Sequence, residues 1–192
     1  MKKTLCLASN SPRRRELIRY LNRPFVTFSV DIDEKSNSND PVEYVREIAN
    51  EKADAVLEQR GMGDDEIVIT ADTCVAVGGE IMGKPGNRAE GFEMLKKLSG
   101  KTHTVSTGVV ILNKLGGTVM RHCLCETTRV TFAELSDGEI NEYLDTGEYA
   151  DKAGAYAIQG AFSKHITGIE GDYNNVVGFP AAAVYELLKT IE

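Results

Sequence analysis

Apolar and polar positions along this chain follow two periods, one typical of strands and one typical of helices. Three compact apolar runs predict short strands at 5–7, 25–32 and 67–71. The third run ends at Asp72 and is typical of a buried central strand. Farther along, strand-type runs at 102–112 and 119–132 are separated by a double-glycine turn, which predicts a long β-hairpin.

Capping residues mark where the helices begin. Ser11 precedes Pro12 and Asp40 precedes Pro41, and a polar cap followed by proline is a typical first turn. The helices are predicted to start after Ser11, Asp40, Asn87 and Ser136 and near Pro180. Because these helices alternate with the strands, the sequence predicts an α/β or mixed α+β fold in one domain over 1–192.

Two segments lack a clear period. Residues 35–40 form a polar stretch and are expected to be a loop. Residues 150–180 are rich in glycine and predict loop with a short strand. Since loops held on a rigid scaffold often carry binding groups, the second segment is expected to help form a site.

The composition limits the classes of function that the protein can have. The chain has 192 residues, 42% of them hydrophobic, and a formal net charge of −7. A negative charge disfavours nonspecific binding to nucleic acid or to anionic membranes. No apolar run approaches the about 18 residues of a membrane span. We therefore expect a cytoplasmic protein without a nucleic-acid or membrane partner.

The four cysteines predict free thiols rather than a metal site. They stand at positions 6, 74, 123 and 125, and none forms a Cys-x-x-Cys pair. Cys123 and Cys125 flank one residue of a strand-type run, so they point to one face and do not easily bridge each other. We expect buried thiols in a reducing compartment.

The start of the first helix predicts an anion site. The free N–H groups of a helix start attract anions, and Arg13, Arg14 and Arg15 add positive charge to the same turn. A phosphate or carboxylate pocket is one interpretation, and a solvated basic turn is the other. The segment is not a Walker loop, because the Gly-x-x-x-x-Gly-Lys pattern is missing.

Asp72 and Lys52 are the leading candidates for chemistry. A carboxylate at the carboxyl end of a strand can hold a divalent metal or accept a proton from water, although Asp72 could also serve as a cap. Lys52 falls on the apolar stripe of its helix, four residues from Ile48 and from Val56. A lysine there either reaches to water along the surface or points into a polar cleft.

Other charged residues carry weaker signals. Lys84 stands between glycine and proline, where an extended backbone can present an ammonium group to an anion. Asp31, Asp33 and Glu34 form an acidic cluster that suggests Mg²⁺ or Mn²⁺, with an ordinary solvated loop as the alternative. The three histidines are scattered, have no zinc-type spacing, and are expected to be structural or surface residues.

Five blocks at ordered spacing resemble one family. They are 7–14 (LASNSPRR), 71–73 (ADT) with 82–85 (MGKP), 98–103 (LSGKTH), 151–160 (DKAGAYAIQG) and 171–180 (GDYNNVVGFP). The chain is similar in these blocks to the Maf family of septum-formation-inhibitor-like nucleoside triphosphate pyrophosphatases. The likeness extends over nearly the whole chain.

The resemblance implies an elongated mixed sheet flanked by helices, folded like inosine triphosphate pyrophosphatases, with a cleft between two lobes. It also implies hydrolysis of a nucleoside triphosphate at the α–β bond, with Mg²⁺ or Mn²⁺ as cofactor and a monophosphate and pyrophosphate as products. A homodimer and a house-cleaning or division-linked role would fit the family.

Individual residues match the family's site positions. The phosphate-handling positions are matched by Ser9, Arg13, Lys52 and Lys84. Glu34 and Asp72 match the acidic positions that hold metal and activate water. Arg14, Thr73 and Gln159 match the subgroup that prefers dTTP and UTP, whereas the subgroup acting on 7-methyl-GTP differs there. The chain departs from the family at Ala157, Phe179 and 162–165, which affects the shape expected for the base pocket.

The leading hypothesis is therefore a metal-dependent dTTP/UTP pyrophosphatase. In it Arg13, Lys52 and Lys84 hold the triphosphate, and Asp72 orients or deprotonates the attacking water. The Gln159 amide has both a donor and an acceptor, so it can pair with a pyrimidine edge. The alternatives are a nucleotide-binding regulator without turnover, a 7-methyl-GTP pyrophosphatase, and a hydrolase of sugar nucleotides or diphosphates.

Overall fold

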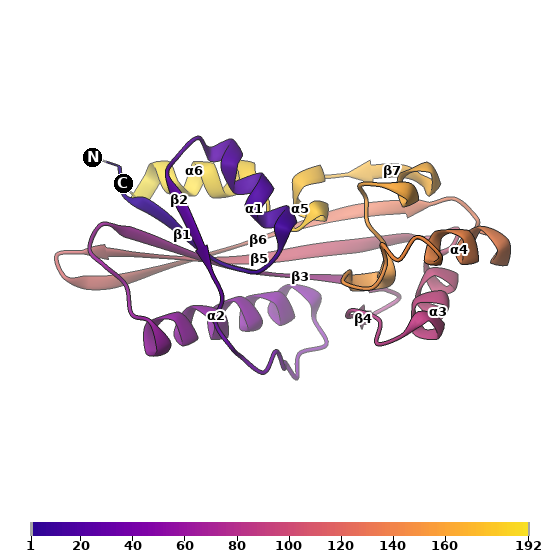
Figure 1. The fold of residues 1–192 in the computed structure, drawn as a ribbon, viewed down its shortest axis with the longest axis horizontal. Coiled ribbons are helices and arrows are strands. Elements are labelled where there is room, and N and C mark those ends of the chain that lie inside the picture. The colour runs from indigo at the N-terminus through magenta and orange to yellow at the C-terminus, as the bar shows by residue number, and fades with distance from the viewer. Residues whose placement is uncertain (1, 192) are drawn as a thin grey trace.

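The computed structural model describes residues 2–191, which share one mixed β-sheet (Figure 1). Within these residues the sheet has seven strands in the order β2-β1-β3-β5-β6-β7, and β4 pairs with β3. The strands are β1 (Thr4–Ala8), β2 (Phe25–Phe28), β3 (Glu66–Val77), β4 (Glu80–Met82), β5 (Thr102–Leu115), β6 (Thr118–Phe132) and β7 (Ile166–Glu170). β1 is parallel to β2 and β3, while the other neighbours are antiparallel.

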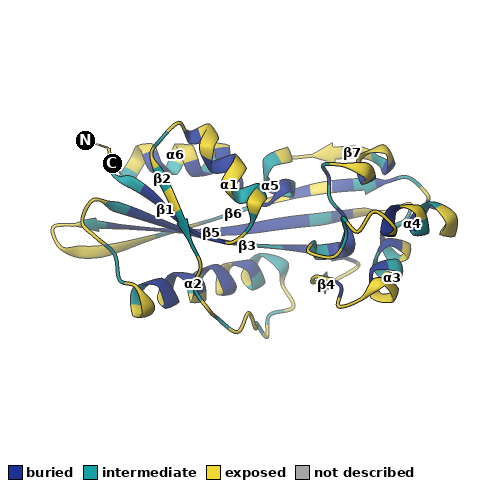
Figure 2. Cartoon of the chain, in the orientation of Figure 1, coloured by how far each residue is buried: buried dark blue, intermediate teal, exposed yellow. Residues whose placement is uncertain are grey.

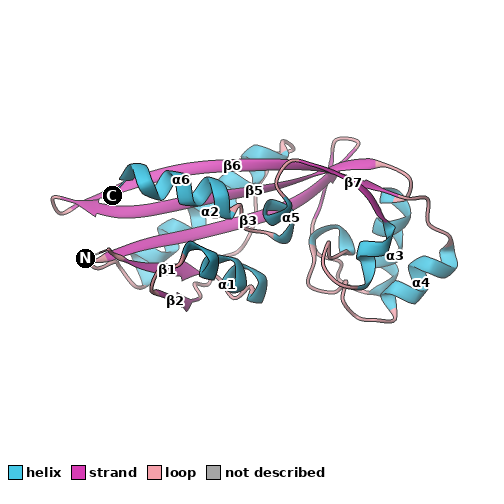
Figure 3. Ribbon diagram, turned by 90° about the horizontal axis from the view of Figure 1, so that it is seen from above, coloured by secondary structure: helices cyan, strands magenta, loops and turns pink. Residues whose placement is uncertain are grey.

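Helices flank this sheet on both faces and at one end. They are α1 (Pro12–Ile18), α2 (Pro41–Gln59), α3 (Arg88–Leu98), α4 (Asp137–Leu144), α5 (Tyr173–Val177) and α6 (Ala181–Ile191). α1 and α6 cover one face of the end that holds both termini, and α2 covers the other face (Figure 1). α3 and α4 lie at the opposite end of the long strands, as the view from above also shows (Figure 3). The elongated mixed α/β fold expected from the sequence is confirmed.

The side-chain alternation of the strands explains the two layers. In β3 Ile67 and Ile69 pack in the core with α1 and α6, whereas Val68 packs on the other face with α2. Buried residues accordingly run along β3 and β5 and on the side of α2 that faces the sheet (Figure 2). Both faces of these central strands are therefore buried from solvent.

The predicted caps are present. Ser11 accepts a hydrogen bond from the N–H of Arg14, and Asp40 accepts from two N–H groups of the first turn of α2. Ser136 and Glu139 form a complete capping box at the start of α4. These local signals set the beginnings of the helices correctly.

Two strand boundaries differ from the prediction by four residues or more. The strand expected over 25–32 ends at Phe28, because β1, its partner, ends at Ala8 and offers no further pairing. The strand expected to end at Asp72 continues to Val77. Beyond Ile69 it loses its parallel neighbour β1 but keeps its antiparallel pairing with β5. Asp72 thus lies just past the end of the parallel part of the sheet, within a continuous strand.

The glycine-rich segment contains more helix than expected. A loop and the short strand β7 are present, but α5 also forms in it, with Asp172 as its N-cap and Gly178 as its left-handed C-cap. The interval from Asp172 to Gly178 is too short to show a helical period, although a polar cap and a terminal glycine bracket it.

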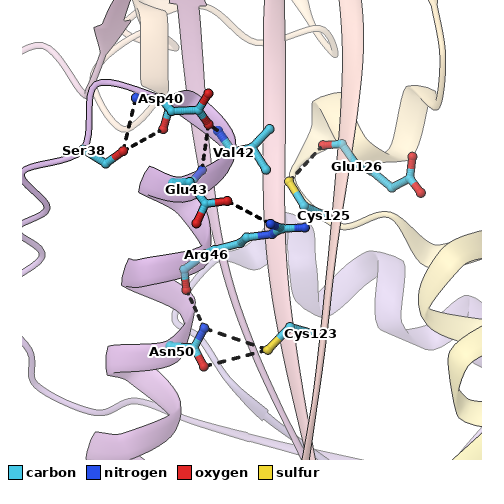
Figure 4. A network of polar contacts seen from close by, with 9 residues as sticks. All are labelled: Ser38, Asp40, Val42, Glu43, Arg46, Asn50, Cys123, Cys125 and Glu126. Carbon is cyan, nitrogen blue, oxygen red and sulfur yellow. Dashed lines mark hydrogen bonds and ion pairs between the residues drawn. The ribbon is translucent and has the colours of Figure 1, made fainter.

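The thiols are free, as expected, but they are not all buried. Cys6 and Cys74 are buried, Cys125 is half-buried and Cys123 is exposed. Cys123 lies beside the outer side of α2, where its sulfur is 3.9 Å from the Asn50 amide (Figure 4). The burial expected for Cys123 is therefore wrong, because α2 covers only part of β6.

No helix within residues 2–191 is both long enough and apolar enough to cross a membrane.

Candidate active site

A cavity of about 590 Å³ opens where the parallel part of the sheet ends. Side chains reach it from the turn from β1 into α1, the loop after β2, α2, the middle of β3, the turn after β4, residues 151–153 and the end of α5. The residues expected from the sequence that line it are Ser9, Arg13, Arg14, Glu34, Lys52, Asp72, Thr73 and Lys84. The structure thus brings together eight of the nine expected site residues, and Gln159 lies in an adjoining space.

The turn between β1 and α1 forms one wall of the cavity. Ser9 is buried, and its hydroxyl accepts a hydrogen bond from the N–H of Ser11 at 3.2 Å. Arg13 and Arg14 face the cavity, but Arg15 is exposed and does not line it. Because successive helical residues point about 100° apart, three consecutive arginines cannot share one face. The expectation that all three serve the pocket is wrong for Arg15.

Lys52 lies at the centre of the charged groups. Its Nζ is 2.8 Å from Asp72 Oδ1, 2.8 Å from Glu34 Oε1 and 3.4 Å from the carbonyl oxygen of Ala71. The Lys52 side chain is only 11% exposed, and that of Asp72 is 13% exposed. A buried charge requires a charged partner. Lys52 therefore points into a polar cleft and does not reach along the surface to water.

Several cations act on Glu34. Its partial burial raises the pKa of the carboxyl group, but the hydrogen bond and charge of Lys52, followed by the charges of Lys84 and Arg14, outweigh that effect. The pKa of Glu34 is therefore lowered, and its carboxylate is ionised at neutral pH.

The acidic cluster of the sequence is divided in the structure. Glu34 turns toward Lys52, whereas Asp33 pairs with Lys35 on the exposed side of the loop. The backbone of Asp31 exchanges hydrogen bonds with the Gln59 side chain. No group of three or more His, Cys, Asp or Glu residues within 2–191 is arranged to hold a metal ion. The metal candidates are consequently two carboxylates, Glu34 and Asp72.

Arg14 is held between two oxygen atoms. Its Nε donates to the carbonyl oxygen of Gly178 at 2.8 Å, and its Nη2 donates to Thr73 Oγ1 at 2.9 Å. Burial lowers the pKa of the guanidinium, while the charges of Asp72 and Glu34 oppose that change. Arg13 is more open, and its nearest acidic partner is Asp151, 3.8 Å away.

A smaller cavity of about 60 Å³ adjoins the first. Gln159, Tyr156 and Ala157 line it, and Arg13 and Thr73 line both cavities. Of the positions that depart from the family pattern, Ala157 lines this space. Phe162 and Phe179 are instead fully buried core residues.

Three contributions to the site were missed by sequence reasoning. Tyr44 lines the large cavity, and its eight-residue separation from Lys52 on one helix stripe was a usable signal. Burial, followed by the nearby Asp72, raises the pKa of Tyr44, so its hydroxyl stays protonated at neutral pH. Lys152 lines the smaller cavity beside Gln159.

Gly108 is the third missed contribution. It pairs with Asp72 across β3 and β5, directly beneath α2. A Cβ atom at this position would lie 2.6 Å from the carbonyl oxygen of Val45 and 2.8 Å from its carbonyl carbon. Since these are backbone atoms, only glycine permits α2 to lie this close to the sheet. The close approach positions the helix that carries Lys52.

The histidines do not enter the cavities. His103 and His165 are buried, and His122 is half-buried beside Asn113. His103 Nε2 is 2.8 Å from the hydroxyl of Tyr156. Their expected structural or surface role agrees with this placement.

The structure so far defines a class of protein: it has a mixed α/β fold and a cavity that gathers both cations and carboxylates. The family model described as Maf-like protein matches residues 4–191, and the chain belongs to the Maf family.

Curated relatives cover nearly the whole chain. A protein of Caldanaerobacter subterraneus subsp. tengcongensis is 49% identical over 95% of this chain and 86% of its own length. Proteins of Koribacter versatilis and Thermococcus kodakarensis are each 45% identical, over 96% and 95% of this chain and 93% and 94% of their own lengths. All three are named dTTP/UTP pyrophosphatase.

Proposed function

We propose that this chain is a metal-dependent nucleoside triphosphate pyrophosphatase that hydrolyses dTTP and UTP to the monophosphate and pyrophosphate. The observation that carries the proposal is the Lys52 ammonium group, which contacts both Glu34 and Asp72 inside a cavity lined by further cations. The names of the relatives, which share 45–49% of their aligned residues with this chain, support the substrate class.

In this proposal the cations bind the triphosphate. Arg13, Lys52 and Lys84 come from three separate elements and line one cavity. Transfer at phosphorus depends on neutralising charge and aligning the attacking and leaving oxygens more than on covalent chemistry. Cations that are already held in place perform this task without reorganising when the reaction occurs.

Asp72 is the proposed acceptor of a proton from water. Its Oδ1 accepts from Lys52 Nζ at 2.8 Å, and among residues 2–191 no donor forms a hydrogen bond to its Oδ2. Lys52 pairs with the first oxygen, and the second oxygen remains available to orient or deprotonate a water molecule.

Glu34 and Asp72 also fit a divalent metal ion. Mg²⁺ is commonly bound by one or two carboxylates, with phosphate oxygens and water completing its shell. Both carboxylates face the cavity that would hold the phosphates, so a set of only two protein ligands is sufficient. A bound Mg²⁺ or Mn²⁺ would neutralise phosphate charge and polarise the phosphorus under attack.

Gln159 is the proposed contact to the base. It lines the smaller cavity beside the one that gathers the charged groups, and its amide offers one acceptor and two donor hydrogens. A pyrimidine edge carries the complementary pattern. This arrangement supports a bound nucleotide with its triphosphate in one cavity and its base in the adjoining one.

Product analysis in labelled water tests the proposal. UTP and dTTP are incubated with the protein and Mg²⁺ or Mn²⁺ in water enriched in ¹⁸O, and the products are examined by mass spectrometry. We expect the monophosphate and unlabelled pyrophosphate, with one ¹⁸O in the monophosphate, because water attacks the α-phosphorus. ATP, GTP and 7-methyl-GTP serve as comparison substrates.

Other products would overturn specific parts of the proposal. Orthophosphate as the first product, or ¹⁸O in the pyrophosphate, would contradict attack at the α-phosphorus. Tight binding of UTP without any product would favour a regulatory nucleotide-binding protein. Faster hydrolysis of 7-methyl-GTP than of UTP would contradict the substrate class.

A further inference from the structure

A chain of buried hydrogen bonds begins at the wall between the two cavities and runs into the core. Arg14 Nη2 donates to Thr73 Oγ1 at 2.9 Å, and Thr73 Oγ1 lies 2.9 Å from Thr107 Oγ1. Thr107 Oγ1 in turn donates to the carbonyl oxygen of Asn175 at 3.1 Å. Thr107 and Asn175 are completely buried, so water does not compete for these bonds.

The two ends of this series of hydrogen bonds determine which atom donates in each of them. A guanidinium group can only donate, and a carbonyl oxygen can only accept. Thr107 has a single hydroxyl proton, which it uses toward the Asn175 carbonyl. The short contact between the two hydroxyls therefore requires the proton of Thr73, so Thr73 donates to Thr107.

This direction leaves Thr73 with no proton for a ligand. A threonine hydroxyl has one proton and two lone pairs. In Thr73 the proton points to Thr107, and one lone pair accepts from Arg14. The remaining lone pair belongs to a half-buried residue that lines both cavities. Thr73 can consequently accept a hydrogen bond there, but it cannot donate one.

The Asn175 carbonyl, at the acceptor end of the series of hydrogen bonds, is held rigidly. The Asn175 side-chain amide donates to the carbonyl oxygen of Val105 at 2.9 Å and to Thr128 Oγ1 at 2.9 Å. Thr128 Oγ1 donates to the carbonyl oxygen of Asp172 and accepts from the N–H of the same residue. α5 is thereby fastened to β5 and β6, and the Asn175 carbonyl cannot turn away from Thr107.

We propose that Thr107 is a positioning residue that makes Thr73 an acceptor-only contact, so that the site selects a nucleotide with a hydrogen-bond donor at the junction of its two cavities. The inference rests on the proposed function for the nucleotide class alone. Thr107 touches neither cavity, and it acts through Thr73.

Two donors are shared by uridine and thymidine nucleotides. One is the N3–H of the base, which cytosine lacks because its N3 is an acceptor. The other is the sugar 3′-hydroxyl. An acceptor facing Thr73 would place two lone pairs against each other, and a polar site that is left unpaired discriminates strongly between ligands.

The experiment measures binding separately from turnover. Non-hydrolysable α,β-methylene triphosphates of uridine, cytidine and 3′-deoxyuridine are titrated by calorimetry into wild type and variants, and hydrolysis of the natural triphosphates is followed in parallel. Thr107→Val removes the hydroxyl at nearly constant volume. The Asn175 carbonyl retains its bond from the N–H of Gly178 at 2.9 Å, so no buried acceptor is left unpaired.

Wild type is expected to bind the uridine analogue at least about tenfold more tightly than one of the other two, and that analogue identifies the donor. In Thr107→Val the Thr73 proton is released toward the ligand, and this preference is expected to fall about tenfold. Thr107→Ser restores the hydroxyl and is expected to restore the preference. Thr104→Val, on the same strand but pointing to the other face, is the matched control and should keep the wild-type preference.

Three outcomes would overturn the inference. They are equal binding of all three analogues by wild type, an unchanged preference in Thr107→Val, and an equal loss of preference in Thr104→Val. A preference that follows the variants as expected, without pyrophosphate release from any nucleotide, would support this inference and contradict the proposed function.

Discussion

The two halves of the sheet are stabilised by different kinds of side chain. In the half that carries the termini, aliphatic residues such as Leu5, Ile67 and Val68 fill both faces beneath α1, α2 and α6. In the half beneath α3 and α4, a cluster of aromatic rings packs among the aliphatic residues. Phe132, Tyr143, Tyr156 and Phe162 lie with ring centroids 4.7–5.4 Å apart, mostly in edge or tilted contact.

This difference follows from what each half must hold. Arg13, Lys52 and Asp72 stand on α1, α2 and β3, whose backbones are fixed by helical and sheet hydrogen bonds, whereas Glu34 and Lys84 stand in loops. The segment that carries Gln159 has little regular structure, and a tyrosine replaces the missing bonds: Tyr143 Oη accepts from the N–H of Ala157 at 3.1 Å. Most of the proposed phosphate-binding groups are thus placed by regular backbone, and the proposed base-binding segment is placed by aromatic side chains.

Truncating the central ring of the aromatic cluster should have the largest effect. Phe162 is fully buried and contacts Phe132, Tyr143, Tyr156 and His165. Phe162→Ala is expected to lower the free energy of unfolding by about 4 kcal/mol, because it leaves a cavity among close-packed rings. Urea denaturation measures the change, with the exposed Tyr20 as a control in Tyr20→Ala. A loss as small as that of the control would contradict the role given to the cluster.

Removing the central carboxylate should act on turnover. Asp72→Asn keeps the side-chain size and leaves Lys52 an amide oxygen, but it removes the proposed proton acceptor. We expect kcat to fall about a hundredfold or more, while the unfolding midpoint changes far less than in Phe162→Ala. Pyrophosphate release is the measurement, and Asp64→Asn, at an exposed aspartate, is the control. Near wild-type release would refute the role of Asp72.

Filling the space under α2 should disturb both stability and activity. Gly108→Ala forces the Val45 carbonyl away from a contact of 2.6 Å. We expect a loss of about 2 kcal/mol in unfolding free energy, and a tenfold lower kcat/KM because Lys52 moves with the helix. Gly138→Ala is the matched control, since a Cβ there meets only Ser136 Oγ at 3.9 Å. If activity survives while stability falls, the close approach does not position the site.

The smallest expected effect is a pH dependence confined to the aromatic half. Burial lowers the pKa of His103 from 6.5 to about 4, so the native state keeps this imidazole neutral while the unfolded chain binds a proton. Stability from this group is complete above pH 6.5 and is lost as the pH falls toward 4. Between pH 7 and pH 5 the loss should be roughly 1–2 kcal/mol.

His103→Gln tests this contribution, because it removes the titrating group while keeping a polar side chain near Tyr156. The decrease in unfolding free energy between pH 7 and pH 5 should be smaller in this variant than in wild type. His122→Gln, at a half-buried position on β6, should retain the wild-type decrease. Equal decreases in all three proteins would show that His103 is not the source.

Local signals were sufficient for elements whose formation depends on neighbouring residues. Ser11, Asp40 and Ser136 each cap the helix that their sequence context predicts, because a cap contacts N–H groups two or three positions away. The apolar stripe on α2 singled out Lys52 but left open whether its side chain reaches to water or points into a cleft, and the structure shows the cleft. Resemblance to a family added the list of site residues, which the structure gathers around adjoining cavities.

Long-range pairing decided the features that were predicted wrongly or missed. β3 continues past Asp72 because β5 still pairs with it after β1 has ended, and the paired residues there lie 28 to 34 positions apart in the chain. Cys123 is exposed because α2 covers only part of β6. Neither fact depends on residues adjacent in sequence.

By itself the sequence determined the alternation of helices and strands, their caps, and the supply of cations and carboxylates, since all of these depend on side-chain type and short spacing. Only the tertiary structure decided that Lys52 contacts both Glu34 and Asp72, that α2 rests on Gly108, and that Thr107 directs the proton of Thr73. These contacts join residues 18 to 63 positions apart in the chain. Their distances and proton directions arise from packing in three dimensions, which no local pattern encodes.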